Sequence, residues 1–516
     1  MSALRLRSVL AGLVLLALGG CETGPSTRDL PPASELGLQL GYRPANLERT
    51  PGSDPGLPGT HMVLAFSGGG MRATALAHGV LRELEATPAP GAAGRTMLDA
   101  VDVISAVSGG SVAAANFVVH GRSGYRRIEE PDGFLRHDGL GELVSGVLNP
   151  ANALYFSTTA ASRIELLSDM FRRTMFAEQT YADLHARSGE RRPFLVLNAA
   201  DMASGERFAF TQRQLDMLCL DLRQVRIADA VAASAAFPVA LTPLPLPNHS
   251  PCPAQRRSPG GIETLFGQPL ALAGYGDLAG WAASCPGRSP PLDMVSLPLR
   301  ARSLRQLPLL NFDPCTMLPI PEEDPRHIRM VHLLDGGTAD NLGLDGPLAT
   351  LTGHGDDARI APAIADGRVQ QIVIIAVNAR SQGQSRAGAD GSTPGVLSML
   401  LGTINTAIDG RSGGLLAQLG TLRELLAARY PGTPQRPLRV RVIGVDFETI
   451  ADSACRAAFQ GISTTWTLSE REILALQEMA SAMLLAAKEY REVAGLFDDL
   501  AAEGQARATA ACARLL

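Results

Sequence analysis

Short apolar runs alternate with amphipathic stretches along the middle of the chain. The runs show no polar alternation and predict buried strands at residues 62–66, 101–106, 193–198, 331–334 and 371–377. Between them, segments such as 71–86 and 110–120 repeat their apolar positions every three or four residues, which predicts helices. Buried strands separated by helices are typical of parallel sheets. The pattern therefore predicts an α/β fold with a mostly parallel central sheet covered by helices on both faces.

One segment breaks this alternation, and three helix-like segments follow it. From 245 to 330, Pro, Gly and Cys are frequent and neither period persists, which predicts a long irregular insertion. Residues 395–408 and 413–430 have large apolar faces, which favour packing in the core over contact with a membrane or an acyl chain. Near the C-terminus, Ser469 and Glu472 form a capping box ahead of a long periodic segment, which predicts a helix.

The first residues predict an export signal. Arg5 and Arg7 precede an apolar stretch, 9–18, that is too short to span a bilayer as a mature helix. The stretch ends in "LALGGC", which resembles the lipobox of bacterial lipoproteins; an ordinary cleaved signal is the alternative. The resemblance implies that Cys21 becomes the acylated first residue and anchors the protein to a bacterial membrane. Glu22 in the following position favours the outer membrane.

These features divide the chain into four parts. Residues 1–20 are the predicted lipoprotein signal peptide, and 21–60 the lipidated cysteine with a flexible tether rich in Pro, Gly and Ser. Residues 61–466 form the α/β domain, and 467–516 a helical segment packed on it. The six cysteines beyond Cys21 are an even number, as expected for an oxidising compartment, and their grouping predicts pairing within each group.

Composition narrows the classes of function. The chain has 516 residues, of which 46% are hydrophobic and 19% charged, so it can bury a large core. Its formal net charge is −5, and no run of Lys or Arg is interleaved with aromatic residues. This balance excludes nucleic acid as an expected partner. The cysteine spacing suggests no metal site, and we expect neither a metal nor another cofactor.

A run of three glycines, Gly68, Gly69 and Gly70, follows the first predicted strand and precedes a helix. Such a loop leaves backbone N–H groups uncovered at the positive end of a helix and favours negative charge. A nucleotide-binding loop would need a different spacing of glycines, which "SGGGMRATAL" does not have. A structural turn would not need three glycines. The third interpretation, an oxyanion hole, requires a nucleophile elsewhere in the chain.

The sequence "VDVISAVSGGSVAAANFVV" offers that nucleophile. An apolar strand leads into Ser108, two glycines and an Ala-rich helix, which is the arrangement of a nucleophile elbow. The G-x-S-x-G pattern is met at Ser108 and Gly110, with Ala106 in place of the first glycine. Ser105 and Ser111 are the alternatives, but the first lies within the strand and the second within the helix. Ser108 is therefore the candidate nucleophile.

A serine hydroxyl needs a base, and Asp335 is the candidate. It ends a predicted strand, is followed by Gly336 and Gly337, and is expected at the carboxyl edge of the sheet, where the serine also emerges. His332 lies deeper in the same strand and is better explained as a structural histidine. The remaining chemistry is a serine paired directly with an aspartate, whose carboxylate accepts the hydroxyl proton.

Four blocks together resemble the patatin-like phospholipases, which use a Ser-Asp dyad. They are "SGGGMRA", "AVSGG", "AVAASAAFPVALTPL" and "DGG", in the order of that family. The last-but-one block contains Ser234 and Pro238, which we assign to scaffold support near the site. The resemblance implies the following roles: nucleophile Ser108; base Asp335; oxyanion hole Gly68, Gly69, Gly70 and Arg72; elbow Ala106 and Gly110; dyad support Gly336 and Gly337.

The resemblance also implies an activity. Ser108 would attack ester bonds of phospholipids or lysophospholipids and form an acyl-enzyme, with membrane lipids as both substrate and anchor. Arg72 would support the glycine loop or meet a lipid phosphate. Two alternatives remain. One is an exported esterase or peptidase that uses Ser108 with a histidine such as His332, and the other is a non-catalytic lipid-binding lipoprotein.

Overall fold

The computed structural model describes the body of the chain. The described residues are 27–35, 40–47, 50–150, 152, 162–187, 192–238, 241–252, 309, 311, 313, 320–353, 355–380, 422, 424–426, 428–431, 437–496 and 499–516. The expected signal peptide, the first residues of the tether, most of the insertion and the segment 395–408 lie outside them. Among the described residues, no helix is long and apolar enough to cross a membrane.

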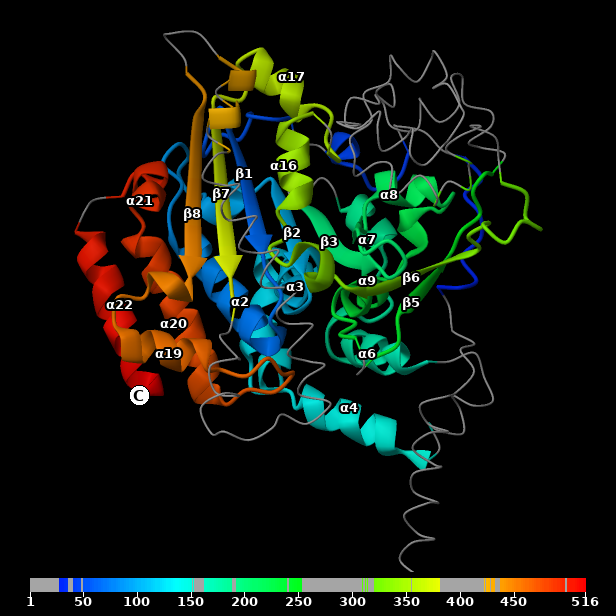
Figure 1. Cartoon of the computed structure of the whole chain (residues 1–516). Coiled ribbons are helices and arrows are strands. Elements are labelled where there is room, and N and C mark those ends of the chain that lie inside the picture. Colours follow the sequence, from blue (N-terminus) through cyan, green and yellow to red (C-terminus); the bar gives the residue numbers. More distant parts are fainter. Residues whose placement is uncertain are drawn as a thin grey trace, which may run out of the picture.

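One sheet organises the described residues (Figure 1). Its strands are β1 (Thr60–Phe66), β2 (Val103–Val107), β3 (Phe194–Asp201), β4 (Arg207–Ala209), β5 (Leu244–Pro247), β6 (Met330–Asp335), β7 (Gln371–Asn378) and β8 (Arg439–Asp446). They lie in the order β5-β6-β3-β2-β1-β7-β8, and β4 pairs with β3. Each predicted strand is present. β4, β5 and β8 were not predicted.

The strands at the centre of the sheet run parallel to one another, whereas β6 and β5, at one edge, pair antiparallel. β1, β2, β3, β7 and β8 pair in parallel, whereas β6 runs antiparallel to β3, and β5 antiparallel to β6. The prediction of a mostly parallel α/β sheet is confirmed. The antiparallel β6 changes how Asp335 reaches the site, because this strand runs toward the glycine loop from the opposite direction to β2.

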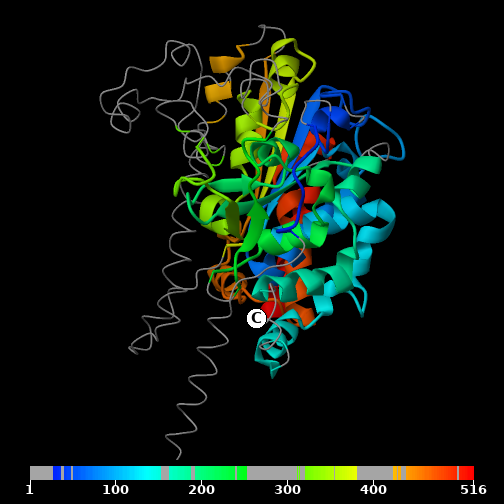
Figure 2. The ribbon, with the colours of Figure 1, turned by 90° about the vertical axis from the view of Figure 1, so that its right-hand side faces the viewer.

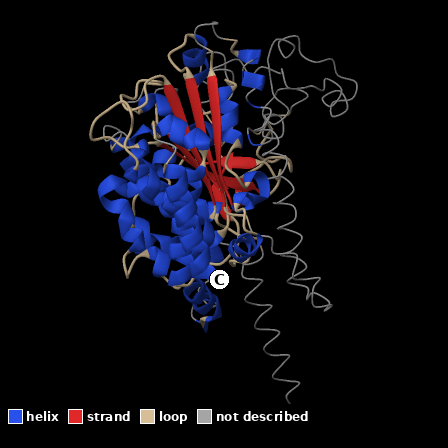
Figure 3. Cartoon of the chain, turned by 90° about the vertical axis from the view of Figure 1, so that its left-hand side faces the viewer, coloured by secondary structure: helices blue, strands red, loops and turns tan. Residues whose placement is uncertain are grey.

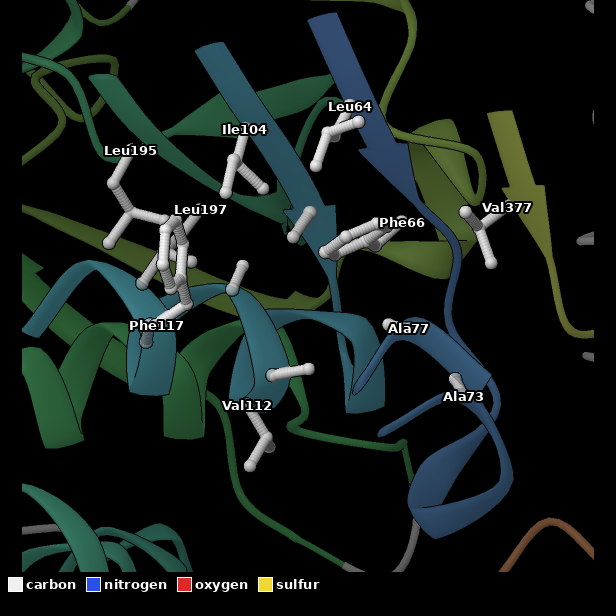
Figure 4. Close-up of a cluster of buried hydrophobic side chains, with 14 of the residues drawn as sticks. Leu64, Phe66, Ala73, Ala77, Ile104, Val112, Phe117, Leu195, Leu197 and Val377 are labelled. Atoms are coloured by element: carbon white, nitrogen blue, oxygen red, sulfur yellow. The ribbon is translucent and has the colours of Figure 1, made fainter. Parts of the chain in front are cut away.

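Side chains of the central strands alternate between two apolar layers. In β1, Leu64 and Phe66 pack on one face with α2 (Gly70–Ala86), α3 (Gly109–Gly124) and α20 (Glu470–Ala486). Figure 4 shows this cluster between the strands and the first two helices. Ala65 faces the other layer, with α16 (Asp345–Leu351) and α17 (Ile360–Ala365). Both faces of the sheet are therefore covered, as predicted, and Figure 3 shows the helices packed beside the strands.

Shorter helices complete the described body. They are α4 (Gly139–Leu148), α6 (Arg163–Phe171), α7 (Tyr181–Ala186), α8 (Gln212–Met217), α9 (Ile227–Ser234), α15 (Gly337–Asp340), α19 (Ser453–Gln460), α21 (Lys488–Ala494) and α22 (Leu500–Leu515). α20 begins at the predicted capping box of Ser469 and packs between α2 and α22. The predicted C-terminal helix is divided at Ala487, which has extended backbone.

The structure moves the start of the predicted insertion and gives two of the cysteine pairs. The insertion does not begin at 245, because residues up to Pro247 form the edge strand β5. Disulfides join Cys219 to Cys252 and Cys455 to Cys512, which matches pairing within each cysteine group. The other two cysteines of the first group lie outside the described residues.

Candidate active site

Ser108 occupies a strained turn between β2 and α3. Its backbone has φ +50° and ψ −123°, a region that non-glycine residues rarely adopt. It is the N-cap residue of α3, so its side chain stands where the strand turns sharply into the helix. Backbone strain of this kind is held in place by surrounding contacts, and it is typical of a nucleophile elbow.

The glycines after Ser108 allow α3 to lie against the glycine loop. A Cβ on Gly109 would lie 1.9 Å from the carbonyl oxygen of Gly70, and one on Gly110 would lie 2.6 Å from that of Ser67. The Thr74 hydroxyl of α2 donates to the Gly109 carbonyl at 2.8 Å and fastens the two segments together. Any side chain at Gly109 would therefore separate the nucleophile from the loop.

Asp335 contacts the nucleophile directly. The Ser108 hydroxyl donates to Oδ2 of Asp335 at 2.8 Å, and the Gly337 amide donates to Oδ1 at 2.8 Å. Gly336 lies tight against β3, since a Cβ there would be 2.1 Å from the Asn198 carbonyl oxygen. β6 brings Asp335 into register with Ala199 of the neighbouring strand β3, level with the end of β2. Asp335 therefore lies where Ser108 emerges, as expected, but it arrives there on an antiparallel strand, whereas the expectation assumed a parallel one.

Burial changes the pKa of the Asp335 carboxyl group. Loss of water raises its pKa from 3.8 to about 6, and the bonds from Gly337 and Ser108 oppose that rise. The folded chain therefore binds this proton more tightly than the unfolded chain does. The stability that comes from this group is complete below pH 4 and is lost as the pH rises through about 6. Ionisation, which a base requires, costs the protein stability.

We expect the rate constant kcat/KM for ester hydrolysis to follow the ionisation of Asp335. Only the carboxylate accepts the Ser108 proton, so activity should fall tenfold per pH unit below an acidic midpoint near 6. Asp340, whose pKa is also raised to about 6, supplies the control. The Asp340→Asn variant should keep the acidic limb. A midpoint near 4 in the wild type, or loss of the limb in that variant, would contradict this assignment.

Ser234 joins three parts of the site through one hydroxyl group. Its Oγ accepts the Ser108 amide at 2.8 Å, lies 2.7 Å from Oγ of Ser111, and donates to the Asn198 carbonyl at 2.6 Å. The side chain is fully buried at the end of α9. The nucleophile's own N–H is thus held by Ser234, which supports the strained backbone of the elbow.

Asn198 supports the strand that leads to the nucleophile. Its side-chain amide donates to the Ala106 carbonyl and to the Ser105 hydroxyl, each at 3.0 Å. Its Oδ1 accepts a bond from Arg207 at 2.8 Å. Ser105 is buried in β2, and Ala106 fits there without a glycine. These bonds hold the end of β2 against β3.

The glycine loop turns directly above the elbow. Gly69 and Gly70 have φ of +143° and +59°, which explains why glycines are needed here. The Gly68 amide donates to the Asn341 carbonyl at 3.1 Å, so it is already engaged and does not fit the oxyanion role expected for it. Within the described part of the chain, no hydrogen bond from the Gly69 or Gly70 amide is present. These two amides are the candidate donors of the loop.

Arg72 lies behind the loop. The side chain is 2% exposed, and its guanidinium donates from Nε to the Ala379 carbonyl at 2.7 Å and from a terminal nitrogen to the Ile462 carbonyl. A Cβ on Gly69 would lie 3.2 Å from this group. Of the two roles considered, support of the glycine loop fits. An oxyanion or lipid phosphate contact does not, because the guanidinium faces backbone carbonyls inside the protein.

The histidines do not approach the dyad. His332 is three residues before Asp335 on β6, so the two side chains project from opposite faces of the sheet. No described histidine is hydrogen-bonded to Ser108 or Asp335. His332 therefore cannot replace Asp335 as the base in this arrangement.

A comparison with protein families identifies the region that carries the elbow. Residues 64–258 match the model of patatin-like phospholipases, a family of lipid acyl hydrolases. Over these residues the chain is similar to the patatin-like phospholipases. The matched region includes Ser108, the glycine loop and Ser234, but not Asp335. The assignment of Asp335 as the base therefore rests on its 2.8 Å contact with Ser108.

Other comparisons give weaker likenesses. Human GIVD cytosolic phospholipase A2 matches with 12% sequence identity and a TM-score of 0.37. The alignment covers 91% of this chain and 65% of the human protein, so the chain spans somewhat less than two thirds of that structure. Ten chains among the solved structures match in all. No curated protein matches the sequence.

Several residues of this candidate site were not predicted from the sequence. Gly109 follows the nucleophile at the first turn of α3, where an elbow places an oxyanion donor, and its place after the serine is the signal that could have identified it. Thr74, Asn198 and Asn341 act through contacts with segments distant in the chain. Thr465 accepts the Met71 amide at 2.7 Å and touches Gly70, and no local motif indicates it.

Proposed function

We propose that the protein is a serine lipid acyl hydrolase that cleaves carboxylic ester bonds of phospholipids or lysophospholipids by a Ser108-Asp335 dyad. The observation that carries this proposal is the 2.8 Å hydrogen bond from the Ser108 hydroxyl to the buried Asp335 carboxyl. The match to patatin-like phospholipases supports the class of substrate.

The dyad accounts for both halves of the reaction. Asp335 accepts the hydroxyl proton as Ser108 Oγ attacks the ester carbonyl, and the C=O electron pair moves to oxygen. Collapse of this intermediate breaks the bond to the alcohol, which leaves with the proton from Asp335. A water molecule then gives a proton to Asp335 and attacks the acyl-enzyme, which releases the fatty acid and restores the Ser108 hydroxyl.

Backbone amides are proposed to hold the negative oxygen of the intermediate. The candidates are Gly69 and Gly70 in the loop and Gly109 at the start of α3. A site that excludes water strengthens such bonds, and removal of one donor typically costs about 10²-fold to 10³-fold in kcat. Arg72 supports this arrangement by holding the loop from behind.

We also propose that the protein is exported and anchored by a lipid on Cys21. The apolar stretch before Cys21 and the "LALGGC" sequence support this proposal. The disulfides at Cys219 and Cys455 fit an oxidising compartment. Mass spectrometry of the purified N-terminus would test it, because a diacylglycerol-modified Cys21 is expected as the first residue.

A lipid fluorophosphonate tests the proposed nucleophile. The purified protein should gain one phosphonyl group, and peptide mass spectrometry should locate it on Ser108. Labelling should fall with pH below about 6, since the attacking hydroxyl depends on the Asp335 carboxylate. A folded wild-type chain that stays unmodified would favour the non-catalytic lipid-binding alternative. A label on Ser105 or Ser111 would show that the nucleophile is misassigned.

A further inference from the structure

Helix α4 has an unusual outer surface. Among the described residues, seven large apolar side chains are exposed, and four of them lie on α4: Leu140 (45%), Val144 (48%), Val147 (36%) and Leu148 (75%). At 100° per residue, these four positions fall within an arc of about 100°. We call them the outer arc of α4. Leu143, which lies about 40° beyond Val147, is partly buried and packs against the core.

Polar contacts fix α4 with the outer arc toward solvent. Asp138 caps the helix by accepting the Gly141 amide at 2.9 Å, and it also accepts the Thr467 hydroxyl at 2.7 Å. Glu142, the only charged residue of the helix, contacts His137 at 2.7 Å and pairs with Arg173. The outer arc therefore carries no charge.

The same contacts place α4 beside the candidate active site. Gly139 packs against Trp466, and the Leu140 amide donates to Thr467. Thr465, the residue before Trp466, contacts Gly70 of the glycine loop. Figures 1 and 2 show α4 at the end of the molecule toward which β1 and β2 point. The outer arc and Ser108 thus belong to the same end of the protein.

We propose that the outer arc of α4 docks on a lipid bilayer surface and brings the site to its substrate. A second copy of the chain fits less well, because a stable interface needs about 800 Å² and some 20 residues from each partner, and the arc offers four side chains. A few apolar side chains suffice for insertion at a bilayer interface.

This proposal rests on the proposed lipid hydrolase function, so its test separates the two. The double variant Val144→Gln and Leu148→Gln removes apolar groups that are already exposed, and it keeps good helix formers. Met202→Gln is the matched control, because Met202 is 52% exposed elsewhere on the surface. The full chain is assayed on phosphatidylethanolamine and phosphatidylglycerol vesicles, on a water-soluble butyrate ester, and by sedimentation with the same vesicles.

We expect vesicle hydrolysis by the double variant to fall about tenfold or more, with hydrolysis of the soluble ester unchanged and the control like the wild type. Equal loss on both substrates would mean that α4 only supports the site, and unchanged vesicle hydrolysis would mean that the arc does not dock; either overturns the proposal. A change in the oligomeric mass of the double variant, measured in the absence of vesicles, would also overturn the proposal. If the wild type hydrolyses neither ester, the proposed function fails. The fraction of wild type and of double variant that sediments with the vesicles then still shows whether the outer arc docks.

Discussion

Replacement of Ser108 by alanine is expected to reduce ester hydrolysis by about 10⁴-fold to 10⁶-fold. The variant removes the attacking oxygen, and the other described hydroxyl bonded to Asp335, that of Thr338, donates to the backbone carbonyl and not to the carboxylate. The backbone should tolerate the change, because alanine and serine meet the same strain at a φ of +50°. The measurement is kcat/KM on a phospholipid and on a soluble ester, with thermal unfolding to verify the fold.

Ser111→Ala is the matched control for this experiment. Ser111 lies three residues away and shares the Ser234 hydroxyl, but it does not contact Asp335. We expect it to retain activity within about tenfold of the wild type. The assignment is wrong if Ser111→Ala abolishes hydrolysis while Ser108→Ala retains it.

Replacement of Asp335 by asparagine should cost about 10³-fold to 10⁴-fold in kcat, with no loss of stability. The asparagine oxygen can still accept the Gly337 amide, but its NH₂ group then faces Ser108 and cannot take a proton. Because the buried Asp335 has a raised pKa, removal of its charge should raise the free energy of unfolding at pH 8.

The measurement is kcat/KM across the pH range, together with chemical unfolding at pH 5 and pH 8. The variant should be folded, inactive and resistant to the fluorophosphonate, and its gain in stability should be larger at pH 8 than at pH 5. Asp340→Asn is the control, since Asp340 is also buried and its carboxylate accepts the amides of Leu344 and Asp345. Full activity in Asp335→Asn would remove the dyad from consideration.

The sequence predicted the parts of the site that depend on local geometry. A strand, a serine, glycines and a helix follow one another around Ser108, so the turn could be inferred from neighbouring residues. The direction of β6 could not, because it depends on pairing with β3 across more than a hundred residues. Asp335 was identified correctly as the partner of Ser108 although the argument used the wrong strand orientation.

Other differences have similar causes. The strand β8, "RVRVIGVD", alternates apolar with charged or small residues at a partly exposed edge of the sheet, so it lacks the continuous apolar pattern used to predict strands. Arg72 is polar and near a helix start, where exposure is the usual expectation, but carbonyls from two distant segments enclose it. Pattern alone does not reveal such long-range partners.

The Cys455–Cys512 disulfide makes the site sensitive to the redox state of its surroundings. It closes a covalent ring across a sequence separation of 57 residues, and this ring contains Thr465, Trp466 and α20. In the chain-entropy model, a loop of that length restrains the unfolded chain by about 4 kcal/mol. Thr465 touches the glycine loop, and Trp466 touches α4. A reducing cytosol does not maintain this bond, so a chain retained there would lose this contribution to the free energy of unfolding of the fold that holds the site.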